Sequence, residues 1–232
     1  MLLHGGGGSR REWFDTGYVE RLQDNYTVIL VDLRGHGESS RPTDPAAYEM
    51  DRLAEDVLAA VDACGVDDFA AWAMSYGGKI GRHLGVHSRR VTRLVLMGTP
   101  LGRGVEGERR QEAIDFLAHW EPTVQAQADG EPSSSALSAS DRDLLGRLDV
   151  PVMLAWVSAM LAWASVEPAD FLCPTLWLIG SEDRHAMASL ARYEATLDRS
   201  MVQVAVVKGL DHQQVFDEID RVLPTLLGFT GR

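Results

Sequence analysis

Residues 69–78 read FAAWAMSYGG, a short apolar run followed by a serine among small residues. The apolar run predicts a buried strand, and a helical pattern follows it. A serine on such a sharp strand-to-helix turn has strained backbone geometry, so small residues are needed two positions before and after it, where Ala73 and Gly77 stand. The turn would project the Ser75 hydroxyl above the carboxyl end of a sheet. The N–H of Tyr76 and the helix N-terminus would lie behind it, ready to receive negative charge.

Further short apolar runs on both sides of this one predict an α/β fold. They span 27–33, 93–98, 175–180 and 202–207. Continuous rather than alternating apolar runs are typical of strands covered on both faces, and the helical patterns between them suit right-handed crossovers. We therefore expect a mostly parallel sheet with helices on both faces. One such helix covers 53–64, and a closing helix covers 215–226, where Pro224 should kink it or restart it.

The alternation of strands and helices is interrupted over residues 101–173, which carry helical patterns and no convincing strand. A loop of that length is uncommon inside a compact domain. We interpret 101–173 as a helical cap inserted into a core formed by 1–100 and 174–232. In the most apolar segment of the cap, we expect apolar side chains along one face of a helix to form a stripe that packs on the core. Part of this stripe is expected to line an apolar pocket for the acyl group. The stripe consists of Met153, Trp156, Met160 and Trp163, and the last three of these are the expected substrate contacts.

The composition excludes several classes of protein. The 232 residues carry a net charge of -12 and no Lys/Arg-rich run, which argues against nucleic-acid binding. Two cysteines, Cys64 and Cys173, establish no disulfide and are compatible with a reducing compartment. The segment MLLHGGGG at 1–8 contains no signal-peptide core, and the most apolar segment, 152–166, is shorter than the roughly 20 residues of a membrane span. We expect a cytoplasmic protein without a membrane span.

A serine hydroxyl is a poor nucleophile until a base removes its proton, so a histidine and an orienting carboxylate are required. Asp183 follows the predicted strand 175–180, and His212 follows 202–207. Strand ends of a parallel sheet meet at one edge, so these groups can converge on Ser75. His185 is the rival base, and Glu182 and Asp211 are the rival acids.

The other histidines predict no metal site. His83 and His87 lie four residues apart, but no third ligand accompanies them, so an exposed helix face is the better interpretation. His4 and His36 are expected to order loops by hydrogen bonding rather than to shuttle protons.

Five motifs in order resemble the α/β-hydrolase superfamily, in its serine esterase and lipase-like branch. They are His4-Gly5-Gly6, DLRGHGES at 32–39, the turn at Ser75, the loop with Asp183 and the final His212. The resemblance implies a Ser75, Asp183 and His212 triad and an oxyanion hole made by the backbone N–H groups of Gly6 and Tyr76. It implies a serine hydrolase that cleaves a small or medium carboxylic ester with no metal or organic cofactor. The pattern specifies neither the acyl chain nor the number of subunits.

Two alternatives to ester hydrolysis stay open. C–C bond hydrolases of this superfamily share the triad and a similar HGGG loop, but they often carry Trp after the final histidine, where this chain has Gln213. The chain could instead be a non-catalytic, ligand-binding relative.

The HG motif begins at residue 4, where relatives usually have a preceding strand pair and a longer strand. We expect residues 1–3 to form a short strand inside the sheet, with 27–33 as the exposed edge strand.

Overall fold

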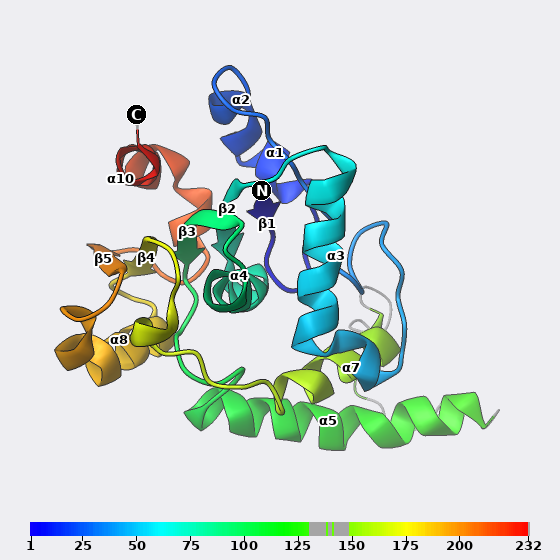
Figure 1. The fold of residues 1–232 in the computed structure, drawn as a ribbon. Coiled ribbons are helices and arrows are strands. Elements are labelled where there is room, and N and C mark those ends of the chain that lie inside the picture. Colours follow the sequence, from blue (N-terminus) through cyan, green and yellow to red (C-terminus); the bar gives the residue numbers. More distant parts are fainter. Residues whose placement is uncertain (130–137, 139–140, 142–148, 232) are drawn as a thin grey trace.

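The computed structural model describes residues 1–129, 138, 141 and 149–231. Its sheet has five parallel strands in the order β1-β2-β3-β4-β5 (Figure 1). The strands are β1 (Leu2–Leu3), β2 (Phe69–Met74), β3 (Val91–Met97), β4 (Thr175–Gly180) and β5 (Val202–Val207). The predicted parallel sheet is confirmed, and strands 69–74, 175–180 and 202–207 have the predicted bounds.

Helices cover both faces of the sheet, as the continuous apolar strands predict (Figure 1). Side chains of one strand alternate between the two resulting cores: in β2, Ala71 and Ala73 pack into one core, and Trp72 and Met74 into the other. The first core includes α3 (Met50–Ala63), α4 (Ser75–His87) and α8 (Arg184–Leu197). The second includes α1 (Glu12–Asp15), α2 (Tyr18–Leu22), α9 (Gln214–Asp217) and α10 (Ile219–Thr230).

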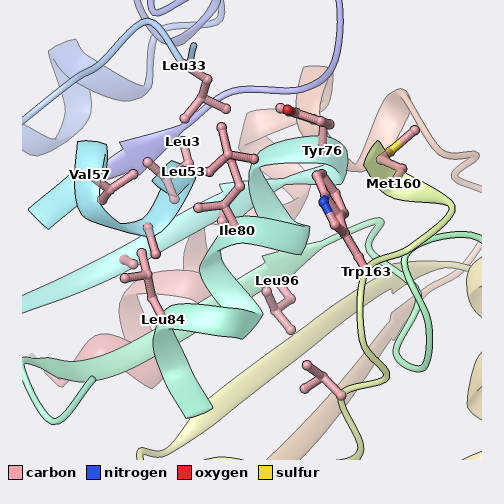
Figure 2. Packing of buried hydrophobic residues seen from close by; sticks show 14 of the residues in the cluster. Leu3, Leu33, Leu53, Val57, Tyr76, Ile80, Leu84, Leu96, Met160 and Trp163 are labelled. Atoms are coloured by element: carbon pink, nitrogen blue, oxygen red, sulfur yellow. The ribbon is translucent and has the colours of Figure 1, made fainter. Parts of the chain in front are cut away.

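Helix α3 has the one-sided apolar pattern predicted for 53–64. Leu53 and Val57 are buried and lie beside Ile80 and Leu84 of α4 (Figure 2). Shortly after α3, Gly65 takes a φ of +67°, a left-handed conformation that ends helices without the cost of a Cβ. Through Leu53 and Val57, α3 packs against α4, the helix that begins with Ser75.

The predicted edge strand 27–33 is largely absent. This segment forms only a single parallel bridge, between Leu30 and Leu2, and the Leu2 N–H donates to Ile29 O at 2.9 Å. Its pairing partner β1 is itself only two residues long. The segment nevertheless lies beyond β1 at the edge of the sheet, and β1 pairs with β2 on its other side.

The closing helix breaks at a different place from the one predicted. The chain interrupts it at Glu218, between α9 and α10, whereas Pro224 lies inside α10. Proline removes one hydrogen-bond donor but here does not end the helix.

Helical segments connect β3 to β4. They are α5 (Gly107–Ala128), α7 (Val150–Met160) and the 3-10 turn η2 (Pro168–Asp170), and α7 packs on α5 and on η1 (Pro45–Tyr48). The division into a core and a cap at 101 and 173 stays a prediction, and part of the cap lies outside the described residues. Within the described part of the chain, no helix is both long and apolar enough to cross a membrane.

Candidate active site

Ser75 begins α4 directly after β2, at the turn that the sequence predicts. Its φ is +49°, and no other described residue except glycine has a positive φ. Such strain persists only where neighbouring structure enforces it. Here the Gly77 N–H donates to His4 O at 3.0 Å, and a Cβ on Gly77 would lie 2.5 Å from the same oxygen. The turn is therefore pressed so closely against β1 that only glycine fits.

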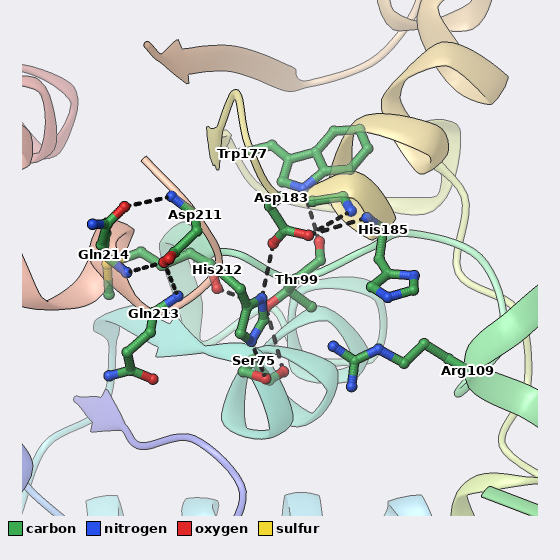
Figure 3. A network of polar contacts seen from close by, with 12 residues as sticks. Ser75, Thr99, Arg109, Trp177, Asp183, His185, Asp211, His212, Gln213 and Gln214 are labelled. Carbon is green, nitrogen blue, oxygen red and sulfur yellow. Dashed lines mark hydrogen bonds and ion pairs between the residues drawn. The ribbon is translucent and has the colours of Figure 1, made fainter. Parts of the chain in front are cut away.

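His212 connects Ser75 to Asp183. Its Nε2 lies 3.0 Å from Ser75 Oγ, and its Nδ1 lies 2.8 Å from Asp183 Oδ2 (Figure 3). An ionised carboxylate can only accept, so Nδ1 carries the proton and Nε2 is left to accept from the serine hydroxyl. The three residues follow β2, β4 and β5, whose carboxyl ends meet at one edge of the sheet.

Asp183 is held as a carboxylate by its position at the N-cap of α8. The residue is 3% exposed, and its Oδ1 accepts the backbone N–H groups of Ala186 at 3.0 Å and His185 at 3.2 Å. Burial acts to raise the pKa of Asp183, but the hydrogen bonds from His212 and from these two N–H groups outweigh it and hold the pKa below its ordinary value. The carboxylate is thus ionised and fixed in orientation at neutral pH.

The rival residues take no part in the hydrogen-bond chain from Ser75 to Asp183. Glu182 is exposed and accepts from Ser181 Oγ at 3.1 Å. The carboxylate of Asp211 accepts the backbone N–H groups of Gln213 and Gln214. His185 lines the same cavity as Ser75, but His212 makes the hydrogen bond to the serine.

Gly6 and Tyr76, the predicted oxyanion donors, line the same cavity as Ser75. The Tyr76 N–H is in the first turn of α4, where no intrahelical acceptor is available. A Cβ on Gly6 would lie 3.4 Å from Tyr76 Cβ, so the loop backbone passes close to the helix start. Gly8 N–H closes this loop by donating to Gly5 O at 3.3 Å.

His4 anchors the same loop from within the core. Its Nδ1 lies 2.7 Å from Gly5 O, and its Nε2 accepts the Leu33 N–H at 3.0 Å. Burial lowers the pKa of His4 to about 4, so the ring is neutral. His36 packs edge-on against His4, and its Nδ1 lies 3.0 Å from Arg34 O. Both rings are therefore engaged in ordering loops.

A cavity of about 720 Å³ opens in front of Ser75. Trp156 and Met160 of α7 line it, as the apolar stripe predicts, together with Phe116 of α5. Trp163 does not line it: its indole N–H donates to Tyr48 O at 3.1 Å, and its ring lies 5.7 Å from that of Tyr76. Two of the three predicted substrate contacts thus face the cavity, and the third supports its wall.

The structure adds cavity residues that the motifs do not reveal. Charged side chains also line it, among them the basic Lys79 of α4 and Arg109 of α5 and the acidic Glu106 and Glu112. The position of Lys79, one helical turn after Ser75, is a signal that could have indicated it. Arg109 depends on how α5 docks, and local sequence carries no sign of that.

No cluster of three or more metal-ligating side chains occurs among the residues that the structure describes. His83 and His87 have ring centroids 4.3 Å apart, and His83 Nε2 lies 3.0 Å from Asp51 Oδ1. This pair lies on α4 well beyond the serine.

Known proteins share this arrangement of elements. Residues 1–149 match the family model described as alpha/beta hydrolase fold. The chain is 37% identical over 189 residues to 3-oxoadipate enol-lactonase 2 of Acinetobacter baylyi, covering 67% of this chain and 69% of that protein. It is 36% identical over 148 residues to rhodomycin D methylesterase DauP of a Streptomyces species, covering 62% of this chain and 45% of that one.

A solved structure, an esterase from Exiguobacterium antarcticum, superposes with a TM-score of 0.74 over 100% of this chain and 91% of its own. Their sequence identity is 17%, so this likeness concerns the fold alone.

Proposed function

Because the chain belongs to the α/β-hydrolase fold family, we propose that it hydrolyses a carboxylic ester with Ser75, His212 and Asp183 as its catalytic triad. The observation that carries this proposal is the continuous hydrogen-bond chain from Ser75 Oγ through the His212 ring to Asp183 Oδ2. A hydroxyl whose proton points at a neutral imidazole, itself fixed by a buried carboxylate, is the arrangement that nucleophilic serine catalysis requires.

In the acylation step, Ser75 Oγ attacks the ester carbonyl carbon while His212 Nε2 takes the hydroxyl proton. The resulting imidazolium is stabilised by the Asp183 carboxylate, which keeps its negative charge. The carbonyl oxygen becomes an oxyanion, and the Gly6 and Tyr76 N–H groups would donate to it; one such donor is worth about 10²–10³ in kcat. His212 then gives its proton to the departing alkoxide, and an acyl-serine remains.

Deacylation repeats these steps with water. His212 Nε2 removes a proton from water as its oxygen attacks the acyl carbon, and the proton returns to Ser75 Oγ when the carboxylic acid leaves. No cofactor takes part in this sequence, which consumes only the ester and water.

The cavity supports a small or medium acyl group. Its volume of about 720 Å³ is in the usual range of small-molecule sites, and Trp156, Met160 and Phe116 give it an apolar wall. Tyr76 and Trp156 lie with ring centroids 5.2 Å apart, so this wall continues to the residue after the nucleophile.

Substitution of the serine tests the mechanism. Ser75→Ala and His212→Ala should each lower kcat/KM for a chromogenic short-chain ester by about 10³-fold or more. His87→Gln, on the exposed end of α4, is the matched control and should keep the wild-type rate. Full turnover by folded Ser75→Ala would contradict the mechanism.

Two further measurements separate the alternatives. A fluorophosphonate probe should form a covalent adduct on Ser75, with loss of fluoride, and its absence in folded protein would favour a non-catalytic ligand-binding protein. A panel of ring-cleavage dienoates and simple esters distinguishes C–C bond hydrolysis from ester hydrolysis. We expect the esters to be the better substrates because Gln213, rather than tryptophan, follows His212.

A further inference from the structure

Lys79 is a basic side chain in the candidate active site for which the ester mechanism has no use. It lies four residues after Ser75 on α4, and residues at this spacing occupy the same face of a helix. Both side chains line the one cavity. The ammonium group donates to Gly104 O, a neutral acceptor, and in the described part of the chain it pairs with no carboxylate. Since an ammonium has three donors, further hydrogen bonds are available to a ligand.

Arg109 brings a second basic side chain to this cavity from α5. Figure 3 shows its guanidinium extending from α5 in the direction of Ser75 and His185. Its nearest carboxylate is that of Glu112, 3.7 Å away on the same helix, and both side chains are about half exposed. Exposed pairs of this kind contribute little, so the guanidinium keeps its capacity to bind an anion.

The two basic side chains are close enough to influence each other. Burial, followed by the charges of Arg82 and Arg109, lowers the pKa of Lys79 well below its ordinary value, and Glu106 alone opposes this. Glu106 is an ionised carboxylate that already pairs with Arg192 and accepts the Arg103 N–H, and these contacts hold its pKa below the ordinary value. A bound anion would favour the protonated form of Lys79, because an opposite charge nearby offsets the cost of burying an ammonium group.

We propose that Lys79 and Arg109 form a subsite for a carboxylate of the substrate, one helical turn from the nucleophile Ser75. The inference rests on the proposed ester hydrolysis and narrows it to esters that carry a negative charge. The apolar wall formed by Trp156 and Met160 would contact the chain between the ester and the carboxylate. The chain has a net charge of -12, so most of its surface repels an anion. Basic side chains in the cavity would attract the anion to the active site.

The test compares anionic esters with neutral esters of the same shape. The first pair is monomethyl adipate and methyl adipamate, in which an amide replaces the carboxylate of the acyl part. The second is 4-acetoxybutyrate and 4-acetoxybutyramide, in which the charge is on the alcohol part. For the wild-type protein we expect kcat/KM of the anionic member of at least one pair to exceed that of its amide by about 10-fold or more, mainly through KM.

The variants Lys79→Met and Arg109→Gln should each remove most of this preference. Ester hydrolysis of the two neutral compounds, which carry an amide in place of the carboxylate, should change by less than about threefold. Arg89→Gln, an exposed arginine in the turn after α4, removes the same charge and should keep the preference. Arg109 is half exposed, so its variant remains informative if Lys79→Met does not fold. Raised salt should reduce the wild-type preference, because the attraction is electrostatic.

Failure of this inference is distinguishable from failure of the proposed function. Hydrolysis of the neutral esters with no preference in either pair, or a preference that both variants retain, would overturn the carboxylate subsite and leave the ester mechanism standing. No hydrolysis of any of the four esters by the wild-type protein would count against both.

Discussion

The backbone N–H of Leu33 donates a hydrogen bond to Nε2 of the buried His4 at 3.0 Å. The other ring nitrogen of His4 is bonded to Gly5 O, and the backbone oxygen of His4 accepts the N–H of Gly77. One buried imidazole thus connects the edge segment 27–33 to the Gly-rich loop and, through its backbone, to the turn at Ser75. Nε2 can accept only when it carries no proton, so this connection requires a neutral ring.

Stability should therefore fall as the pH is lowered from neutral. Burial lowers the pKa of His4 from 6.5 to about 4, so between these values the unfolded chain binds a proton that the folded chain excludes. The contribution is fully present above pH 6.5 and is lost as the pH falls toward 4. It amounts to about 1 kcal/mol between pH 7.5 and 5.5. Urea unfolding at the two pH values measures it.

The control for this pH dependence is His4→Gln, whose amide oxygen can accept from Leu33 and carries no titratable group. We expect a lower free energy of unfolding at pH 7.5 but a smaller loss on going to pH 5.5. An unchanged loss in the variant would show that other groups, such as His36, account for the dependence.

Asp183→Asn should separate the two roles of this side chain. Asparagine is as good an N-cap as aspartate, so α8 should keep its start and the melting temperature should change by a few degrees at most. The amide cannot stabilise an imidazolium, so kcat should fall by about 10²–10⁴-fold. Kinetics with a short-chain ester and thermal unfolding measure the two effects. Glu182→Gln changes the neighbouring exposed carboxylate and should leave kcat within about twofold of wild type.

Gly77→Ala should damage the turn at Ser75. The added Cβ would lie 2.5 Å from His4 O and 2.7 Å from Leu3 O, both backbone atoms of a buried strand or its end. Relief requires the helix start to move, which we expect to cost about 1–3 kcal/mol and to lower activity, because Ser75 moves with it. Gly228→Ala in α10 is the matched control. Nothing lies within 4 Å of its Cβ, so it should stabilise the helix slightly. Equal melting temperatures for the two variants would contradict this account.

The strands and the candidate triad could be predicted because their signals are local. The runs 69–74 and 175–180 are largely buried, so their composition alone marks them, and 202–207 keeps a similar apolar composition although it is only partly buried at the end of the sheet. Ser75, Asp183 and His212 stand shortly beyond the ends of these three strands. The segment 27–33 has the same composition but only a two-residue partner, so the extent of its pairing depends on a different part of the chain.

The apolar stripe of the cap shows a second reason why sequence spacing can misplace a residue: the spacing does not reveal where the helix ends. Helix α7 ends at Met160, so Trp163 lies beyond the helix, and the three-residue step from Met160 no longer keeps it on the same face. Its indole instead reaches the backbone of Tyr48 in η1. Arg109 could not be placed at the site from sequence at all, because its approach depends on the packing of α5 against α7.

Substitution of the two tryptophans should give different results because one lines the cavity and the other supports its wall. Trp156→Ala removes an aromatic ring from the cavity, so we expect the preferred acyl chain in a series of p-nitrophenyl esters to lengthen, with kcat/KM for the shortest ester falling about 10-fold. Trp163→Phe keeps the packing against Tyr76 but loses the hydrogen bond to Tyr48 O, which should cost about 1–2 kcal/mol of stability and leave the chain-length profile unchanged. Thermal unfolding and the ester series, measured on both proteins, separate the two roles. A shifted profile in Trp163→Phe, or an unshifted one in Trp156→Ala, would show that the acyl group binds elsewhere.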